Sequence, residues 1–189
     1  MKKPEAVTVD CASCRLSKTR KNVVRGKGLS SSRIVFVGEA PGRDEDLRGE
    51  PFVGSAGRTL NKAFADLGVS RDDVFVTNLV KCRPPGNRKP RRDEIEACKG
   101  NLCAEVHQIE PSVLCLLGQT VTQELLGYKG RMSDLVGKEV EATVCGRRIK
   151  CVVAYHPAAC LYRRSNYESF SMAIERGLQL ARLEGEDLP

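Results

Sequence analysis

The stretch RIVFVGEAPG, residues 33–42, decides the fold of this chain. Its first half, RIVFV, is an apolar run rich in β-branched residues, which predicts a buried strand. Glycine, proline and acidic residues are dense from Gly38 to Gly57, so we expect a long loop there rather than a regular element. A loop of this kind directly after a buried strand is typical of α/β proteins, in which ligands bind at the carboxyl ends of strands.

Strand and helix signals alternate along the rest of the chain. Apolar runs predict strands, the last two forming a hairpin, at residues 74–77, 113–117, 140–144 and 148–154. Helical spacing and capping residues predict helices at residues 60–67, 93–109, 120–126 and 167–183. The alternation indicates an α/β fold: a single three-layer α/β/α domain with a central, mostly parallel sheet of about four strands. We assign residues 1–189 to this domain, with residues 1–10 as a loose N-terminal tail.

Three groups of polar or small residues follow predicted strands and should converge at one edge of the sheet. They are residues 38–42, Asn78 and the pair His156-Pro157. Convergence of this kind predicts a ligand site. Taken alone, Asn78 could equally be a turn residue at a strand end, and His156 could be a histidine packed in the core.

The charge distribution indicates a polyanionic partner. The chain has 31 Lys+Arg against 24 Asp+Glu, which gives a formal net charge of +7. Basic residues without any acid occupy residues 12–37 and residues 81–92. Neutralisation of phosphates would give such a surface affinity for nucleic acid, although a basic surface can also serve solubility alone. Because no apolar run could span a bilayer and no signal peptide is visible, we expect a cytoplasmic protein without membrane association.

Nine cysteines are a high count, and an odd number cannot pair completely within one chain. Because no secretory signal is visible, we do not expect disulfides. Cys11 and Cys14 form a C-x-x-C pair, and Cys82 and Cys98 follow far along the chain. Four such thiolates can hold an iron–sulfur cluster or a zinc ion, and the wide spacing of the last two favours the cluster. The other five are expected core residues, Cys115 and Cys151, or have no predicted role, Cys103, Cys145 and Cys160.

The ordered motifs resemble the family 4 uracil-DNA glycosylases over nearly the whole chain. The similarity is carried by GEAPG at residues 38–42 followed by Glu45-Asp46, GEPFVG at residues 49–54, Thr77-Asn78, KCRPP at residues 81–85 with Asn87-Arg88, and His156-Pro157. The resemblance implies a monofunctional DNA glycosylase that hydrolyses the N-glycosidic bond of a flipped-out uracil and leaves an abasic site. It also matches Cys11, Cys14, Cys82 and Cys98 to the ligands of a structural [4Fe-4S] cluster.

Three residues match the family's recognition groups. Phe52 matches the aromatic ring that stacks on uracil, and such stacking contributes about 1–3 kcal/mol to holding a flipped base. Asn78 matches the amide that pairs with the uracil edge; because an amide offers both a donor and an acceptor, it can favour uracil over cytosine. His156 matches the histidine that hydrogen-bonds the developing uracil anion, which would lower the barrier to its departure.

Four further residues complete the expected pocket. Glu39 matches the motif glutamate implicated in catalysis, and Asn87 matches a loop residue involved in positioning water. Glu45 matches a glutamate that bars the methyl group of thymine. Ala40 lies in the uracil-binding motif, where many relatives in the wider superfamily carry aspartate, so we expect Glu39 or Asn87 to direct the water. Ala158 departs from the family, which commonly has serine after His-Pro.

Uracil-containing DNA is the expected partner, and we expect Arg83, Arg88 and Arg163 to contact its phosphates. DNA repair or replication proteins are a second class of partner, and we expect a monomer. Two other functions stay open: a non-catalytic iron–sulfur DNA-binding module, and an enzyme in which residues 38–42 cradle a nucleotide phosphate. The retained pocket residues argue against the module, and the lack of a P-loop Lys-Ser/Thr argues against the nucleotide enzyme.

Overall fold

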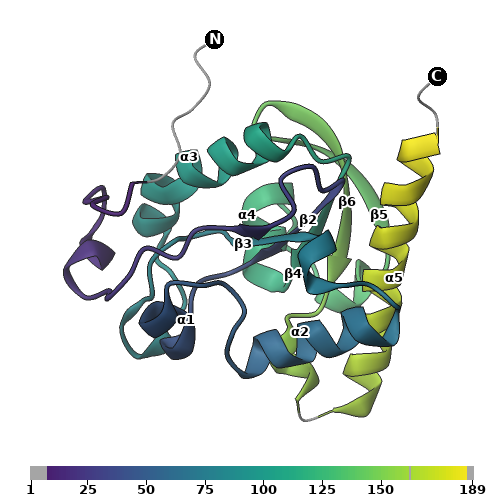
Figure 1. Cartoon of the computed structure of the whole chain (residues 1–189), viewed down its shortest axis with the longest axis horizontal. Coiled ribbons are helices and arrows are strands. Elements are labelled where there is room, and N and C mark those ends of the chain that lie inside the picture. Colours follow the sequence, from purple (N-terminus) through teal and green to yellow (C-terminus); the bar gives the residue numbers. More distant parts are fainter. Residues whose placement is uncertain (1–7, 162, 187–189) are drawn as a thin grey trace.

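The computed structural model describes residues 8–161 and 163–186 of the chain (Figure 1). The strands are β1 (Lys27–Gly28), β2 (Ile34–Gly38), β3 (Phe75–Asn78), β4 (Val113–Leu117), β5 (Glu139–Val144) and β6 (Arg147–Ala154). The α-helices are α1 (Arg43–Arg48), α2 (Ser55–Asp66), α3 (Arg92–Ile109), α4 (Gln119–Leu126) and α5 (Arg164–Glu186). The predicted tail at residues 1–10 falls mostly on residues 1–7, outside the described part. No described helix is long and apolar enough to cross a membrane.

One sheet of six strands runs through the domain in the order β1-β3-β2-β4-β6-β5. The four inner strands pair in parallel, whereas β1 and β5 pair antiparallel at the two edges. The predicted sheet of about four strands therefore corresponds to the parallel part, and the full count is six. The edge strand β1 was missed because two residues are too few to show a hydrophobic pattern.

Helices cover both faces of the sheet, which confirms the predicted three-layer α/β architecture. Ile34 and Phe36 of β2 pack with α2 and α5 on one face, whereas Val35 and Val37 pack with α3 and α4 on the other. The alternation follows from the two-residue period of a strand, and burial on both faces explains why this strand is a continuous apolar run. The inner strands are parallel, so their carboxyl ends share one edge of the sheet (Figure 1).

The stretch from Gly38 to Gly57 is not the continuous loop that its composition predicted. It contains α1 and the first turn of α2, which begins at Ser55. The carboxylate of Glu45 accepts the backbone N–H of Gly42 at the start of α1, and Gly49 ends the helix with φ 72°. Three acidic residues occupy the first turn, where they interact favourably with the helix dipole. The signal for this helix therefore lay in its caps rather than in apolar spacing.

The expectation that the chain forms no disulfide is wrong for one cysteine pair. Cys103 of α3 and Cys145 of the β5–β6 turn are joined by a disulfide. The helix and the turn are distant in sequence, so only the packed fold brings these two thiols together. Cys115 and Cys151 are fully buried free thiols, which confirms their placement in the core. Burial raises the pKa of Cys151 to about 12 and thus keeps this thiol protonated and unreactive.

Candidate active site

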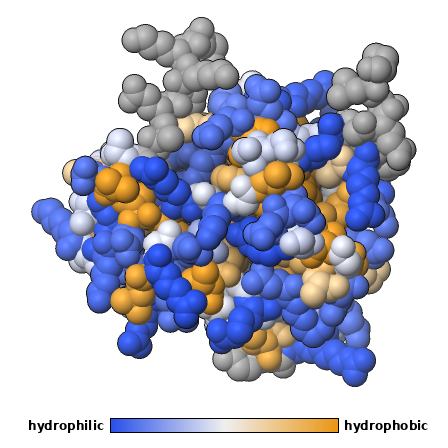
Figure 2. Space-filling model, in the orientation of Figure 1, coloured by the Kyte–Doolittle hydropathy of each residue, from blue (hydrophilic) through white to orange (hydrophobic). Residues whose placement is uncertain are grey.

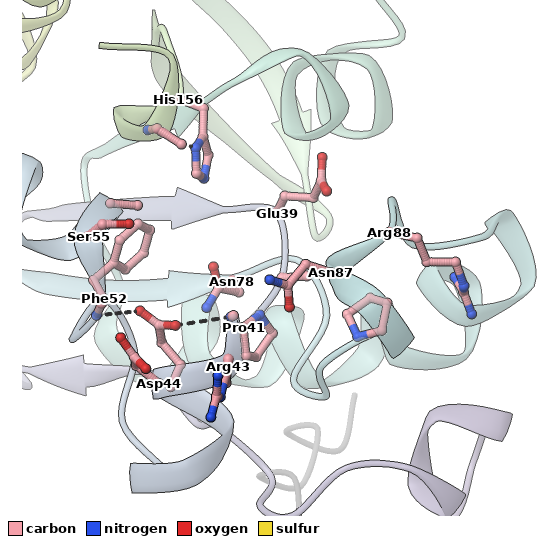
Figure 3. A pocket seen from close by; sticks show the side chains of 17 residues that line it. Glu39, Pro41, Arg43, Asp44, Phe52, Ser55, Asn78, Asn87, Arg88 and His156 are labelled. Atoms are coloured by element: carbon pink, nitrogen blue, oxygen red, sulfur yellow. Dashed lines mark hydrogen bonds between the residues drawn. The ribbon is translucent and has the colours of Figure 1, made fainter. Parts of the chain in front are cut away.

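A cavity of about 380 Å³ lies beyond the carboxyl ends of β2 and β3 and beside the segment that follows β6 (Figure 3). The predicted convergence of the three sequence groups is confirmed, because all of them contribute to its wall. The predicted residues that line it are Glu39, Ala40, Glu45, Phe52, Asn78, Asn87, Arg88 and His156. Four further lining residues had no sequence signal of their own: Arg43, Asp44, Ser55 and Ala56. All four lie at the start of α1 or α2, and the cap signals of those helices could have identified them.

Gly38 lets two recognition side chains approach the end of β2. It pairs with Asn78 of β3 in the parallel register. A Cβ atom at Gly38 would lie 2.5 Å from Oδ1 of Asn78 and 2.5 Å from Cζ of Phe52. Both distances are shorter than van der Waals contact, so any larger residue would displace the amide or the ring. The first glycine of the motif is therefore required by close packing around the pocket.

Phe52 is held in an uncommon backbone conformation. Its φ is +56°, in the left-handed region that a bulky residue seldom adopts, and its side chain is buried. A Cβ atom at Gly57 would lie 1.8 Å from the carbonyl oxygen of Phe52, so α2 packs directly on this backbone. Residues in such conformations persist only where the surrounding structure fixes them, and they cluster at functional sites. The ring lines the cavity from one side (Figure 3).

Glu45 fastens the loop that carries Phe52. Its carboxylate accepts backbone N–H groups from Gly42 at 3.1 Å, Val53 at 3.0 Å and Gly54 at 2.8 Å. These bonds join the start of α1 to the residues directly after Phe52. The carboxylate is therefore a fixed part of the cavity wall, and its position depends on backbone groups rather than on solvent.

His156 is the N-terminal cap of a short 3-10 helix, Pro157–Cys160, and its ring is directed toward the cavity (Figure 3). Its Nδ1 accepts the backbone N–H of Ala158 at 3.2 Å, which requires the ring proton to be on Nε2 in the neutral form. Burial lowers the pKa of His156, although the charges of Glu39 and Glu45 oppose this shift. A Cβ atom at Gly118 would lie 3.0 Å from that of His156, so Gly118 gives the histidine room. The site therefore presents a neutral imidazole that donates from Nε2.

The two residues expected to direct water both line the cavity but differ in their surroundings. Asn87 has φ +56°, and its Oδ1 accepts a hydrogen bond from Nε of Arg83 at 2.6 Å. That bond orients the amide of Asn87. Glu39 follows directly on β2, beside Ala40, whose methyl group offers no polar atom to a water molecule. Among the two candidates, Glu39 is the one that carries a charge.

The three arginines expected to contact phosphate are placed differently. Arg88 forms a two-fold ion pair with the buried Glu94, at 2.6 and 2.8 Å, and this pair fastens the loop to the start of α3. Arg83 is engaged with Asn87, while the side chain of Arg163 is exposed beside the start of α5. Contacts of these residues with DNA stay predictions. The face shown in Figure 2 is largely hydrophilic, with small separate apolar patches.

The four cysteines predicted to bind a cluster line a second cavity. Cys82 and Cys98 are buried, and Cys11 and Cys14 are half-buried. Hydrogen bonds reach Sγ of Cys98 from the backbone N–H of Lys81 at 3.3 Å and from a neighbouring asparagine amide at 3.4 Å. Donors of this kind at sulfur are typical of the surroundings that tune iron–sulfur clusters.

The four cysteines of this cavity are free thiols. In residues 8–161 and 163–186, no group of three or more His, Cys, Asp or Glu side chains could hold a metal ion. Burial raises the pKa of Cys82 to about 11, so this thiol stays protonated unless an electrophile binds it. Four thiols at one cavity are the ligand number of both an iron–sulfur cluster and a structural zinc site.

Comparison with known proteins agrees with this geometry. The family model of the uracil-DNA glycosylase superfamily matches residues 26–176. A type-4 uracil-DNA glycosylase of Archaeoglobus fulgidus is 45% identical over 168 residues, which are 85% of this chain and 84% of that protein. Another, of Saccharolobus solfataricus, is 45% identical over 157 residues, 80% of this chain and 73% of the relative. The chain belongs to the uracil-DNA glycosylase superfamily and, within it, to the type-4 uracil-DNA glycosylases.

Proposed function

We propose that this protein excises uracil from DNA by hydrolysing the N-glycosidic bond of a flipped-out nucleotide, leaving an abasic site and an intact strand. It is a hydrolase of base excision repair. The observation that carries the mechanism is that Phe52, Asn78 and His156, from three separate segments, line one cavity. A base inside a duplex is out of reach of such a cavity, so the nucleotide must rotate out of the helix, at a cost of a few kcal/mol.

Recognition of uracil rests on the ring of Phe52 and the amide of Asn78, which both pack closely against Gly38. Stacking on Phe52 offsets part of the flipping cost, about 1–3 kcal/mol. Asn78 offers its donor and acceptor to the neighbouring N–H and carbonyl of uracil, whereas cytosine presents a mismatched pattern. The carboxylate of Glu45, fixed by three backbone N–H groups, would bar the methyl group of thymine. Selectivity therefore comes from groups that cannot rearrange to suit another base.

Bond cleavage places negative charge on uracil and positive charge on the sugar. Neutral His156 donates from Nε2 to the uracil oxygen on which charge accumulates, and a donor fixed in a buried site contributes strongly to such stabilisation. The carboxylate of Glu39 is suited to stabilise the sugar cation and to orient the attacking water, with the Asn87 amide as its partner. Because water rather than a lysine attacks the sugar, no Schiff base forms and the strand is not cut.

The cysteine cavity is proposed to hold a [4Fe-4S] cluster through Cys11, Cys14, Cys82 and Cys98. When bound, the cluster would serve as a structural cross-link that shapes the DNA-binding surface. Its ligands would come from the N-terminal arm, from α3 and from the loop after β3, which also carries Arg83 and Arg88. We propose that uracil-containing DNA is bound by a monomer in the cytoplasm, through this basic loop and Arg163, with repair or replication proteins as further partners.

The test is incubation with a labelled oligonucleotide that holds one uracil, followed by hot alkali. We expect a strand break only after alkali, and no product from the matched oligonucleotide with thymine. No break after alkali would contradict glycosylase activity and favour a non-catalytic DNA-binding module. A break before alkali would contradict the monofunctional mechanism.

Iron and sulfide analysis of protein purified without oxygen tests the proposed cluster. A colourless protein that contains zinc would contradict it.

A further inference from the structure

The inference concerns Lys81, a charged residue with a completely buried side chain. Its ammonium donates three hydrogen bonds: to Oγ1 of Thr77 at 2.6 Å, to the carbonyl oxygen of Asn78 at 2.7 Å and to Oε2 of Glu105 at 2.6 Å. These bonds use all three donors of the ammonium group. A buried lysine is rare unless it is paired, so the residue needs a physical reason for its position.

These hydrogen bonds lie at the end of β3, beyond the two residues that pair with β1. Strand β1 pairs with β3 only at Phe75 and Val76, so it ends before Asn78. On the other side, Asn78 is held by its parallel pairing with β2. The ammonium of Lys81 supplies the donor for the Asn78 carbonyl on the side that β1 does not reach. Lys81 therefore completes the hydrogen bonding of the residue whose side chain enters the uracil pocket.

The lysine is itself fixed from several directions. Its carbonyl oxygen accepts the backbone N–H of Val24, and its backbone N–H donates to Cys98 Sγ. Its partner Glu105, on α3, also accepts the backbone N–H of Gly26 at 2.8 Å and the hydroxyl of Thr77. The N-terminal arm, the end of β3 and α3 thus meet at this ammonium. A lysine side chain anchored in this way can hold the carbonyl group of Asn78 in one position.

We propose that Lys81 is a positioning residue that holds Asn78 in the orientation that reads uracil. A buried ion pair is weak evidence for stability, because apolar side chains of similar volume are often as good or better. An apolar side chain at this place could not donate to the Asn78 carbonyl, however. The inference rests on the proposed role of Asn78, since a displaced strand end affects selectivity only if that amide contacts the base. A shift well below 1 Å is enough to weaken such a contact.

The test removes both buried charges together in the variant Lys81→Met/Glu105→Gln, so that no carboxylate is left unpaired. We expect inhibition by free uracil to weaken about 10- to 100-fold and single-turnover excision to slow by a similar factor. Affinity for DNA that already contains an abasic site should not change, because that contact depends on the basic surface. Val152→Ala, which truncates a buried side chain of β6 away from both cavities, is the control for general destabilisation.

Four further results would test this role of Lys81. If the double variant keeps wild-type uracil inhibition and excision rate, the proposal is wrong. It is also wrong if activity is lost only in proportion to iron, because Lys81 then acts through the cysteine site alone. Should the double variant not fold, Thr77→Val breaks one link of the network without removing either charge, and it should also weaken inhibition by free uracil.

Asn78→Ala, measured in parallel, separates the positioning role of Lys81 from the recognition role of Asn78. Unchanged inhibition by free uracil in that variant would overturn the role of Asn78 itself.

Discussion

The pocket that we propose binds uracil and the cysteine cavity are both lined by the short segment from Asn78 to Cys82, but they are built on different principles. In the pocket, the polar side chains of His156 and Glu45 are already fixed by backbone N–H groups. In the cysteine cavity, the thiols lie among apolar residues such as Leu16. The polar groups of the pocket are therefore held by the protein's own backbone, whereas the sulfur atoms of the cysteine cavity are free thiols that we propose bind a cluster. Changes in the two regions should have different consequences.

The largest effect should come from Asn78→Ala. This change removes the amide but leaves the backbone of β3 and its bond to Lys81 in place. We expect kcat/KM for uracil excision to fall about 1000-fold, or about 4 kcal/mol, because a site built to hydrogen-bond its substrate loses recognition without any replacement. The melting temperature should change little. A fall in stability together with activity would instead show that the pocket is not organised independently of the fold.

The second effect is the pH dependence of the His156 donor. Burial lowers the pKa of His156, so the ring is neutral at pH 7 and stays neutral somewhat below the usual histidine value of about 6.5. Protonation would place a proton on Nδ1 and break its bond with the Ala158 N–H. The single-turnover rate should therefore be flat above about pH 6.5 and should fall only as the pH drops through the lowered pKa.

The matched variant for this measurement is His156→Gln. It should be about 100-fold slower, the usual cost of one lost donor to a developing anion, and its rate should lack the acid limb. If the fall in rate at low pH persists unchanged in His156→Gln, the titrating group is not His156. A rate that rises as the pH falls would contradict a neutral histidine as the working form.

The contrast between the regions also explains what could be predicted from sequence. The continuous apolar run at residues 33–37 indicated a doubly covered strand, and the order of motifs located Phe52, Asn78 and His156. The strand depends on neighbours along the chain, whereas the three site residues were placed by the resemblance to a known family. The Cys103–Cys145 disulfide and the Lys81–Glu105 pair depend on which surfaces of α3 meet distant segments. No local pattern contains that information, so both were missed.

The third effect belongs to the cysteine region. Cys98→Ala removes a sulfur that accepts two hydrogen bonds, one of them from the backbone of Lys81. We expect loss of bound iron, loss of visible absorption and a lower melting temperature, with a fall in excision rate about tenfold, well short of that of Asn78→Ala. Cys115→Ala is the control, because Cys115 is a buried free thiol outside both cavities. Full iron content in Cys98→Ala would contradict the assigned ligand set.

The smallest effect should come from arginines that contact DNA phosphates, and it shows which region binds the DNA. Arg163 is exposed near the His156 segment, whereas Arg20 lies against the cysteine cavity. If each neutralises one phosphate, replacing either with alanine should weaken binding only a few-fold and reduce the slope of log affinity against log salt by about 1. Arg148→Ala is the control, because that guanidinium is paired with Glu141 on the distant hairpin.

The salt slope separates two ways of holding the substrate. Equal changes in Arg163→Ala and Arg20→Ala would mean that the duplex spans both regions, so that the cysteine region acts on catalysis through DNA placement. A reduced salt slope in Arg163→Ala alone would mean that DNA contacts only the region near the pocket. The cysteine region would then contribute to stability only. Because phosphate contacts carry no sequence information, neither variant should alter the preference for uracil over thymine. An altered preference would mean that the arginine shapes the pocket itself.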